Sequence, residues 1–213
     1  LREKENFVSY TSSRLAFKEV RAYELLPSLL TITFCSIMPI LFTMHPTMIT
    51  QAALPGELFM PLAAIFCFGG IFLPEQVAGV TDVLNSKRTQ LVSIYMIRFG
   101  WYTVLLSMIN LLLIIGYQLP NFAGVLYFDF VTKVLFVGSL TVFSYAASRS
   151  LAAAYLIPTV YFALCIGYPH LGPLNLFILM RQQPWTDNWW QLGVAVLLLV
   201  GGFGLVTKRA VRS

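Results

Sequence analysis

Charged residues are scarce in this chain. Asp, Glu, Lys and Arg make up 11% of its 213 residues, against about 25% in soluble domains. Hydrophobic residues make up 58%, and the mean hydropathy is +0.76. So few polar side chains cannot cover a fold in water, which excludes an ordinary soluble domain. We therefore expect an all-α integral membrane protein, whose length suits one membrane domain and no second, soluble domain.

Cysteine and histidine are also few, and neither forms a motif. Cys35, Cys67 and Cys165 lie in apolar runs, which argues against a disulfide framework and is typical of small packing residues. His45 and His170 fall in different expected outer loops and lack the HExxH spacing of a zinc site. No GxxxxGK loop, paired carboxylates or nucleophile with a base is evident. We therefore expect no catalytic residue, metal ligand or cofactor-binding residue in this chain.

Long apolar runs dominate the rest of the sequence. A span needs roughly 20 apolar residues, and six segments qualify: about 25–44, 58–73, 99–117, 128–147, 151–168 and 189–206. Six spans place both termini on one side, and of the 14 Lys and Arg residues all but Lys133 and Arg181 fall on that side. Because Lys and Arg mark cytoplasmic loops, we expect cytoplasmic termini and a multi-pass protein of the plasma (inner, cytoplasmic) membrane. The very short connection 148–150 predicts a tight hairpin of the fourth and fifth spans.

Residues 1–24 are a basic lead-in to the six-helix transmembrane domain, residues 25–213. They hold five basic residues and no apolar core long enough for a signal peptide, so no cleavable signal is expected. Apolar residues alternate with Arg14, Lys18 and Arg21 at roughly helical spacing. This pattern predicts an interfacial helix, with its apolar face in the inner leaflet and its basic side chains at the headgroups. A solvated lead-in to the first span is the alternative.

The connection between the last two spans, residues 169–188, contains a short apolar stretch, Leu174–Met180, bracketed by prolines. This stretch is too short to span a bilayer. It predicts an outer re-entrant element, a short helix dipping into the outer leaflet and buried against protein. Three tryptophans would anchor it at the outer interface: Trp185, Trp189 and Trp190. An ordinary outer loop is the alternative.

Ion-coupled transport usually leaves a charged residue within the membrane. The one candidate in the sequence is Lys133, near the outer end of the fourth span, with Asp129 one turn earlier. That i, i+4 pair can be satisfied locally, and Lys133 can extend its ammonium group outward to the interface. The first and third spans carry only neutral polar groups, which more often bond to backbone or to a neighbouring helix than to a substrate. The sequence therefore gives little support to a proton or sodium relay.

A polar, charged segment, residues 74–90, interrupts the apolar runs after the second span. Its apolar residues recur at helical spacing, so Glu75–Leu84 is expected to form a short helix parallel to the membrane on the cytoplasmic side. Gly79 would permit close approach of another backbone. Such a helix can rest on lipid or dock into a groove of a partner protein, with Lys87 and Arg88 at the acidic rim of the groove.

Six spans with cytoplasmic ends, an interfacial helix first and a re-entrant element before the last span resemble the ABC-2 type permeases, the membrane subunits of ATP-binding-cassette exporters. The local match follows the second span, where these permeases tend to show Glu, three residues, Gly, two residues, an acidic residue, one residue and Leu, then a basic residue entering the third span. Those positions are Glu75, Gly79, Asp82, Leu84 and Arg98 here. The position after the glycine is a valine where threonine is common, and the usual following proline is absent.

The resemblance implies a permease subunit that forms half of an ATP-driven export pathway for an amphiphilic, peptide or lipid-linked substrate. It implies two kinds of partner besides membrane lipid: a second permease subunit, identical or homologous, and an ATP-binding-cassette ATPase subunit. ATP and Mg would bind to that ATPase, so this chain is expected to be neither an enzyme nor a nucleic-acid-binding protein. The first, second and fifth spans would face the partner half and the path. The implied ATPase-coupling residues are Glu75, Gly79, Val80, Asp82, Val83, Leu84, Lys87 and Arg88.

Two other readings of the sequence remain. An ion-coupled secondary transporter, or a membrane scaffold, would need no ATPase partner. It predicts a coupling charge within the membrane or inverted repeats, and neither is evident from the sequence. An enzyme embedded in the bilayer is the third reading, and it lacks visible acid–base groups.

Overall fold

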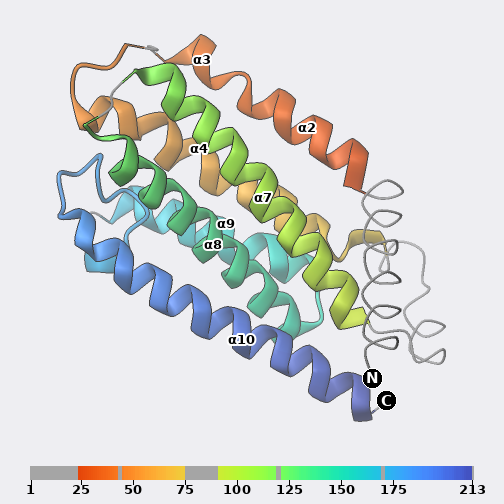
Figure 1. Ribbon diagram of the computed structural model, residues 1–213. Coiled ribbons are helices and arrows are strands. Elements are labelled where there is room, and N and C mark those ends of the chain that lie inside the picture. The colour runs from red at the N-terminus through yellow and green to blue at the C-terminus, as the bar shows by residue number, and fades with distance from the viewer. Residues whose placement is uncertain (1–23, 43–44, 75–90, 119–120, 169–170, 213) are drawn as a thin grey trace, which may run out of the picture.

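The computed structural model describes residues 24–42, 45–74, 91–118, 121–168 and 171–212 (Figure 1). The described residues are all-α and contain no strand. The helices are α2 (Leu25–Cys35) and α3 (Met38–Leu41), which continue one apolar stretch, then α4 (Ile49–Gly70), α7 (Leu91–Tyr117), α8 (Ala123–Ser148), α9 (Leu151–Gly167) and α10 (Asn188–Arg212). Two 3-10 turns, η2 (Gly172–Leu174) and η3 (Trp185–Asp187), lie between α9 and α10. The prediction of an all-α protein is confirmed.

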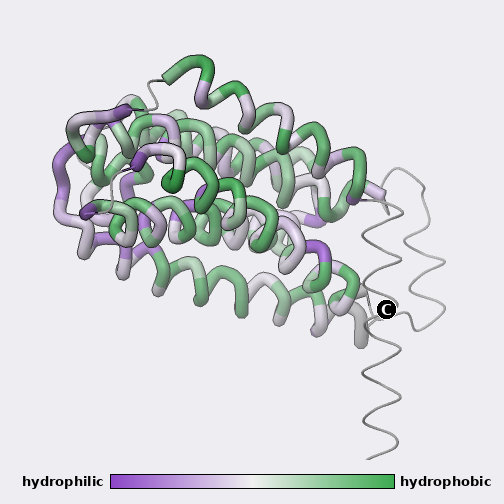
Figure 2. The backbone as a smooth tube through the Cα atoms, turned by 45° about the horizontal axis from the view of Figure 1, so that its top comes forward, coloured by the Kyte–Doolittle hydropathy of each residue, from purple (hydrophilic) through white to green (hydrophobic). Residues whose placement is uncertain are grey.

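Four of these helices are long and apolar enough to cross a membrane: Ile49–Gly70, Val92–Tyr117, Ala123–Ser148 and Trp185–Lys208. The shortest has 22 residues, which reach about 33 Å at 1.5 Å per residue, close to the thickness of the hydrocarbon core. Two shorter apolar stretches, Leu25–Leu41 and Leu151–Gly167, accompany them. Most residues along the helices are hydrophobic, and hydrophilic residues gather at the end of the bundle that holds the α9–α10 connection (Figure 2). These features are those of a multi-pass membrane protein.

Helix α8 lies at the centre of the bundle and packs against α10, α4, α9 and α7. Glycines permit this close packing. An added Cβ at Gly56 of α4 would lie 2.1 Å from the Phe130 ring of α8, and one at Gly138 of α8 would lie 2.6 Å from the Phe68 ring of α4. Helices in lipid associate through such close contacts, because no hydrophobic effect drives them together. The consequence for function is that α4 and α8 approach closely beside Glu57, the neighbour of Gly56.

Two predicted span boundaries differ from the structure. The second span was expected to begin near residue 58, but α4 begins at Ile49 and includes Glu57. The third was expected from residue 99, but α7 begins at Leu91 and includes Arg98. A charged residue in a sequence indicates a membrane edge, yet both side chains are buried against partners on other helices. The predicted hairpin is confirmed, since α8 ends at Ser148, Arg149 adopts a left-handed φ of 57°, and α9 begins at Leu151.

Candidate functional site

Most of the residues predicted to be functional lie outside the described part of the chain. The interfacial helix with Arg14, Lys18 and Arg21 is among them. So are the expected coupling residues Glu75, Gly79, Val80, Asp82, Val83, Leu84, Lys87 and Arg88. Both remain predictions. Arg98, the basic residue of the same motif, is described and lies in one of two buried ionic sites.

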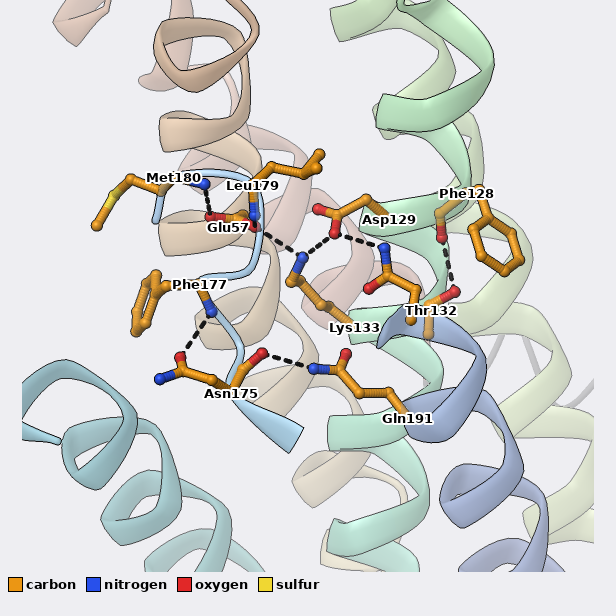
Figure 3. Close-up of polar contacts among 11 residues, drawn as sticks. Glu57, Phe128, Asp129, Thr132, Lys133, Asn175, Phe177, Leu179, Met180 and Gln191 are labelled. Carbon is orange, nitrogen blue, oxygen red and sulfur yellow. Dashed lines mark hydrogen bonds and ion pairs between the residues drawn. The ribbon is translucent and has the colours of Figure 1, made fainter. Parts of the chain in front are cut away.

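The first site is a buried group of three charged side chains, Glu57, Asp129 and Lys133, here called the ion cluster (Figure 3). The Lys133 ammonium on α8 donates a hydrogen bond of 2.8 Å to Oε1 of Glu57 on α4, and another to Oδ1 of Asp129 one turn away. All three side chains are 0% exposed. Asn188 at the start of α10 donates from Nδ2 to the same Asp129 oxygen at 2.9 Å. The cluster therefore joins α4, α8 and α10 in the protein interior.

Glu57 also binds the connection between α9 and α10, here called the connecting segment (residues 171–187). Its Oε1 accepts a hydrogen bond of 2.8 Å from the backbone N–H of Leu179, and its Oε2 accepts one of 2.9 Å from that of Met180 (Figure 3). Residues 176–179 are buried but not helical, so helical hydrogen bonding does not satisfy their backbone donors. Buried donors need partners, and the Glu57 carboxylate supplies one for Leu179 and one for the next residue, Met180.

Polar side chains also bind carbonyl groups within the connecting segment and at the end of α9. Gln191 of α10 donates to the Asn175 carbonyl at 2.6 Å, and the Tyr161 hydroxyl of α9 donates to the Leu174 carbonyl. The Arg181 guanidinium donates to the Cys165 and Ile166 carbonyls at the end of α9, at 2.8 and 3.0 Å. The connecting segment is therefore fixed to α4, α9 and α10 by hydrogen bonds that involve polar side chains.

The short helix suggested for Leu174–Met180 is absent, and the physical reason is local. The Asn175 side chain accepts a hydrogen bond of 2.9 Å from the backbone N–H of Phe177. Such a bond gives the backbone an alternative to the helix. The donors of Leu179 and Met180 are occupied by Glu57. Trp185 and Trp190 are exposed at this end of the bundle, in keeping with the expected interfacial tryptophans.

Lys133 does not extend toward the surface as the sequence suggested, because Glu57 meets its ammonium in the interior. Its local pairing with Asp129 is confirmed. Glu57 itself was missed, although a lone carboxylate beside the apolar run that begins at Leu58 was visible in the sequence. Extending that run back through Gly56 and Pro55 to Ile49 would have placed Glu57 within the helix.

The second ionic site lies at the opposite end of α4 and is here called the junction: Glu24, Ile71, Arg98 and Tyr102. Arg98 Nε lies 3.2 Å from Glu24 Oε1, and the Arg98 guanidinium donates to the Ile71 carbonyl just after α4. The Tyr102 hydroxyl donates to the other Glu24 oxygen. Arg98 and Glu24 are only 1% and 2% exposed. The junction therefore links the start of α2, the end of α4 and the first turns of α7.

Neither site has the composition of a metal centre. Among the described residues, no group of three or more His, Cys, Asp or Glu side chains could hold a metal ion. The three cysteines are free and buried, as expected for packing residues. The ionic sites instead provide charge pairing and hydrogen bonds, which can hold irregular backbone in place and transmit movement between helices.

Comparisons with protein-family models, with curated proteins and with solved structures found no match. The functional argument therefore rests on the residues and on their arrangement in space.

Proposed function

We propose that this chain is the permease subunit of an ATP-binding-cassette transporter of the ABC-2 type. It would form half of an export pathway for an amphiphilic, peptide or lipid-linked substrate, together with a second permease subunit in the cytoplasmic membrane. The observation that carries the proposal is the junction. Residues 75–88, the segment expected to bind the ATPase, lie in sequence between Ile71 and Arg98, which are hydrogen bonded to each other.

The junction supports this proposal because it connects the expected coupling segment to three helices. A force on residues 75–88 would act on the end of α4 at Ile71 and on α7 at Arg98. The bond between Arg98 and Glu24 would transmit it to α2. A buried ionic link is costly to break, about 3–5 kcal/mol when one partner is removed. The three helix ends would therefore move as a unit when ATP binding and hydrolysis change the ATPase between two conformations.

The packing order of the helices is compatible with a path on one side of the bundle. Helix α4 packs against both α2 and α9, so the expected second span lies beside the expected first and fifth spans. Large exposed side chains on α2, α9 and α10 are apolar, for example Leu30, Leu156 and Leu197. Exposure alone therefore does not separate a lipid face from a partner face. By the resemblance to ABC-2 permeases, a partner subunit and substrate would meet α2, α4 and α9, and lipid would cover α10.

At the other end of α4, the connecting segment would form the outer closure of the path. Glu57 and Ile71 are 14 residues apart on or just beyond α4, which corresponds to about 21 Å at 1.5 Å per residue. One helix therefore carries the junction at the proposed cytoplasmic end and the ion cluster at the proposed outer end. Movement of α4 would act on the connecting segment through the hydrogen bonds from Leu179 and Met180 to Glu57.

A second candidate function is favoured by the ion cluster. An ion-coupled secondary transporter would need charged residues within the membrane, and three fully buried ones are present. The hydrogen bonds from the connecting segment to Glu57 give the cluster a structural role that an ATP-driven permease would also need. This reading requires no ATPase, and a membrane scaffold would require neither an ATPase nor transport.

The experiment that separates these functions is purification of the tagged full chain from its native membrane in mild detergent. The proposal predicts an associated ATPase subunit, ATP hydrolysis by the complex, and loss of both in Val80→Asp or Leu84→Asp. The matched control is Val196→Ala on the exposed α10 face, which should leave both unchanged. Transport by a preparation that contains no nucleotide-hydrolysing partner would contradict the proposal and favour the ion-coupled alternative.

A further inference from the structure

We propose that the ion cluster is a binding site for a single proton, held on Oδ2 of Asp129. This inference concerns the described residues alone and does not depend on the proposed transport function. It follows from the number of charges, the hydrogen-bond partners of each carboxylate oxygen and the complete burial of the group.

The count of charges leaves one negative charge unmatched. Two carboxyl groups, Glu57 and Asp129, share one ammonium group, Lys133, and all three are 0% exposed. If all were ionised, the cluster would carry a net charge of −1. An uncompensated charge in the protein interior is strongly unfavourable, and buried groups instead take up or release a proton.

The elements packed around the cluster supply no second cation. Helix α10 contributes the neutral side chains Asn188 and Gln191. The connecting segment contributes backbone N–H groups, and its Arg181 donates to carbonyls at the end of α9 instead. The ionisable groups of α9 near this segment are Tyr161, which donates to the Leu174 carbonyl, and Cys165.

Charged groups on α7 are remote from the cluster. Arg98 lies in the junction at the opposite end of the bundle, where it pairs with Glu24. Tyr117, at the end of α7, is buried and neutral in charge. Lys133 therefore remains the only positive charge that faces Glu57 and Asp129 among the described residues, and one of the two carboxyl groups must be neutral.

The hydrogen bonds identify Asp129 as the neutral one. Glu57 accepts three donors on its two oxygens, from Lys133, Leu179 and Met180. Hydrogen bonds to a carboxylate favour its ionised form. Asp129 accepts both of its donors on Oδ1, while Oδ2 is buried with no hydrogen-bond partner. An oxygen that accepts twice beside one that accepts nothing is the arrangement expected of a carboxylic acid, with Oδ1 as carbonyl and Oδ2 as hydroxyl.

No donor reaches Oδ2 to stabilise a negative charge there. The Asn188 amide donates to Oδ1 and not to Oδ2. The buried carbonyl oxygens of the Asn188 and Gln191 side chains also have no hydrogen-bond partner. A neutral hydroxyl left unpaired is less unfavourable than an uncompensated buried charge. Protonated Asp129 is therefore more favourable than ionised Asp129 even if no neighbouring side chain changes its position.

Proton binding is coupled to the connecting segment through Lys133. With Asp129 neutral, the charge of Lys133 is matched by Glu57, which binds the backbone of Leu179 and Met180. Loss of the proton leaves two carboxylates in competition for one ammonium and weakens this arrangement. Because an aspartate in water is ionised at neutral pH, unfolding would release the proton, and the stability of the folded protein should fall as the pH rises.

The test counts protonated carboxyl groups by infrared spectroscopy of the purified full chain in lipid nanodiscs at neutral pH. The wild type should show the carbonyl stretch of one protonated carboxyl, which shifts when aspartate, but not glutamate, is isotopically labelled. Charge counting predicts the variants: none in Asp129→Asn, none in Glu57→Gln and two in Lys133→Met. Glu24→Gln is the matched control, because Glu24 is paired with Arg98, and it should leave the wild-type signal unchanged.

Several results would overturn the proposal. A wild type without the signal would show that the cluster is not protonated. A shift on labelling glutamate would place the proton on another residue. A signal that Glu57→Gln retains would contradict the charge count. If the signal is absent and the thermal stability depends on sodium or potassium concentration, a monovalent cation neutralises the cluster instead. The labelling of the wild type decides the question even if a variant fails to fold.

Discussion

Lys133 on α8 and Glu57 on α4 are 76 positions apart in sequence, and a hydrogen bond of 2.8 Å joins them in a site without solvent exposure. Glu57 in turn binds the backbone of Leu179 and Met180. One carboxylate thus balances a charge on α8 and satisfies the donors of a buried, non-helical segment. Through this double role Glu57 links α8 directly to the α9–α10 connection.

We predict that Glu57→Gln and Lys133→Met each lower the free energy of unfolding by about 1–3 kcal/mol. Asp129 can change its protonation to keep the cluster neutral, so the cost comes from buried hydrogen-bonding groups that lose a partner. The double variant should lose less than the sum of the two, since both substitutions remove the same hydrogen bond. Thermal unfolding in detergent, followed by circular dichroism, measures the effect. Additive losses would show that the two residues act independently.

A second prediction concerns the close contact of α4 and α8. Gly56→Ala would place a Cβ 2.1 Å from the buried Phe130 ring, and we expect a loss of about 1–3 kcal/mol from overpacking. Phe130→Leu in the same chain should recover part of it. The control is Gly100→Ala on α7, where nothing lies within 4 Å and where alanine should stabilise the helix slightly. Equal effects of the two glycine substitutions would contradict the packing described here.

The junction yields a third prediction. Arg98→Met should lower stability by about 3–5 kcal/mol, because Glu24 then loses its guanidinium partner in a buried site. Tyr102→Phe removes only one hydrogen bond to Glu24 and should cost less, about 1.5–3 kcal/mol. In a preparation with its ATPase, Arg98→Met should also reduce transport more than ATP hydrolysis, which a purely stabilising role would not produce.

The proposed topology can be tested by thiol labelling from each side of the membrane. The native cysteines are only 5%, 2% and 0% exposed, so they should remain unlabelled. We expect Lys87→Cys to react with an impermeant reagent only from the cytoplasmic side and Trp185→Cys only from the outside. Labelling of position 87 from the outside would contradict the predicted orientation.

The helices and the local Asp129–Lys133 pair could be predicted from the sequence, whereas the contacts between helices that form the two ionic sites could not. Apolar runs identify spans because a run of about 20 apolar residues matches the thickness of the hydrocarbon core of a bilayer. From the sequence, Glu57 and Arg98 were placed at the edges of the membrane. Their partners Lys133 and Glu24 are far away in sequence, so the pairing that allows burial could not be seen. Lys133 was assigned an outward position for the same reason.

Local competition explains the other difference between prediction and structure. The apolar stretch after Pro173 suggested a short helix, but Asn175 and Glu57 occupy the donors that such a helix would use. A hydropathy pattern does not contain this information, because one competitor is a side chain within the stretch and the other comes from α4. The residues expected to bind an ATPase stay a prediction from sequence.

The most direct test of the central claim is photo-cross-linking at position 84, with Leu84 replaced by a photoreactive amino acid in native membranes. A residue on the exposed α10 face, Leu197 (73% exposed), serves as the control and should cross-link to lipid. The account predicts that position 84 cross-links to a nucleotide-hydrolysing protein and that ATP changes the yield. Cross-linking of position 84 to lipid alone would contradict it.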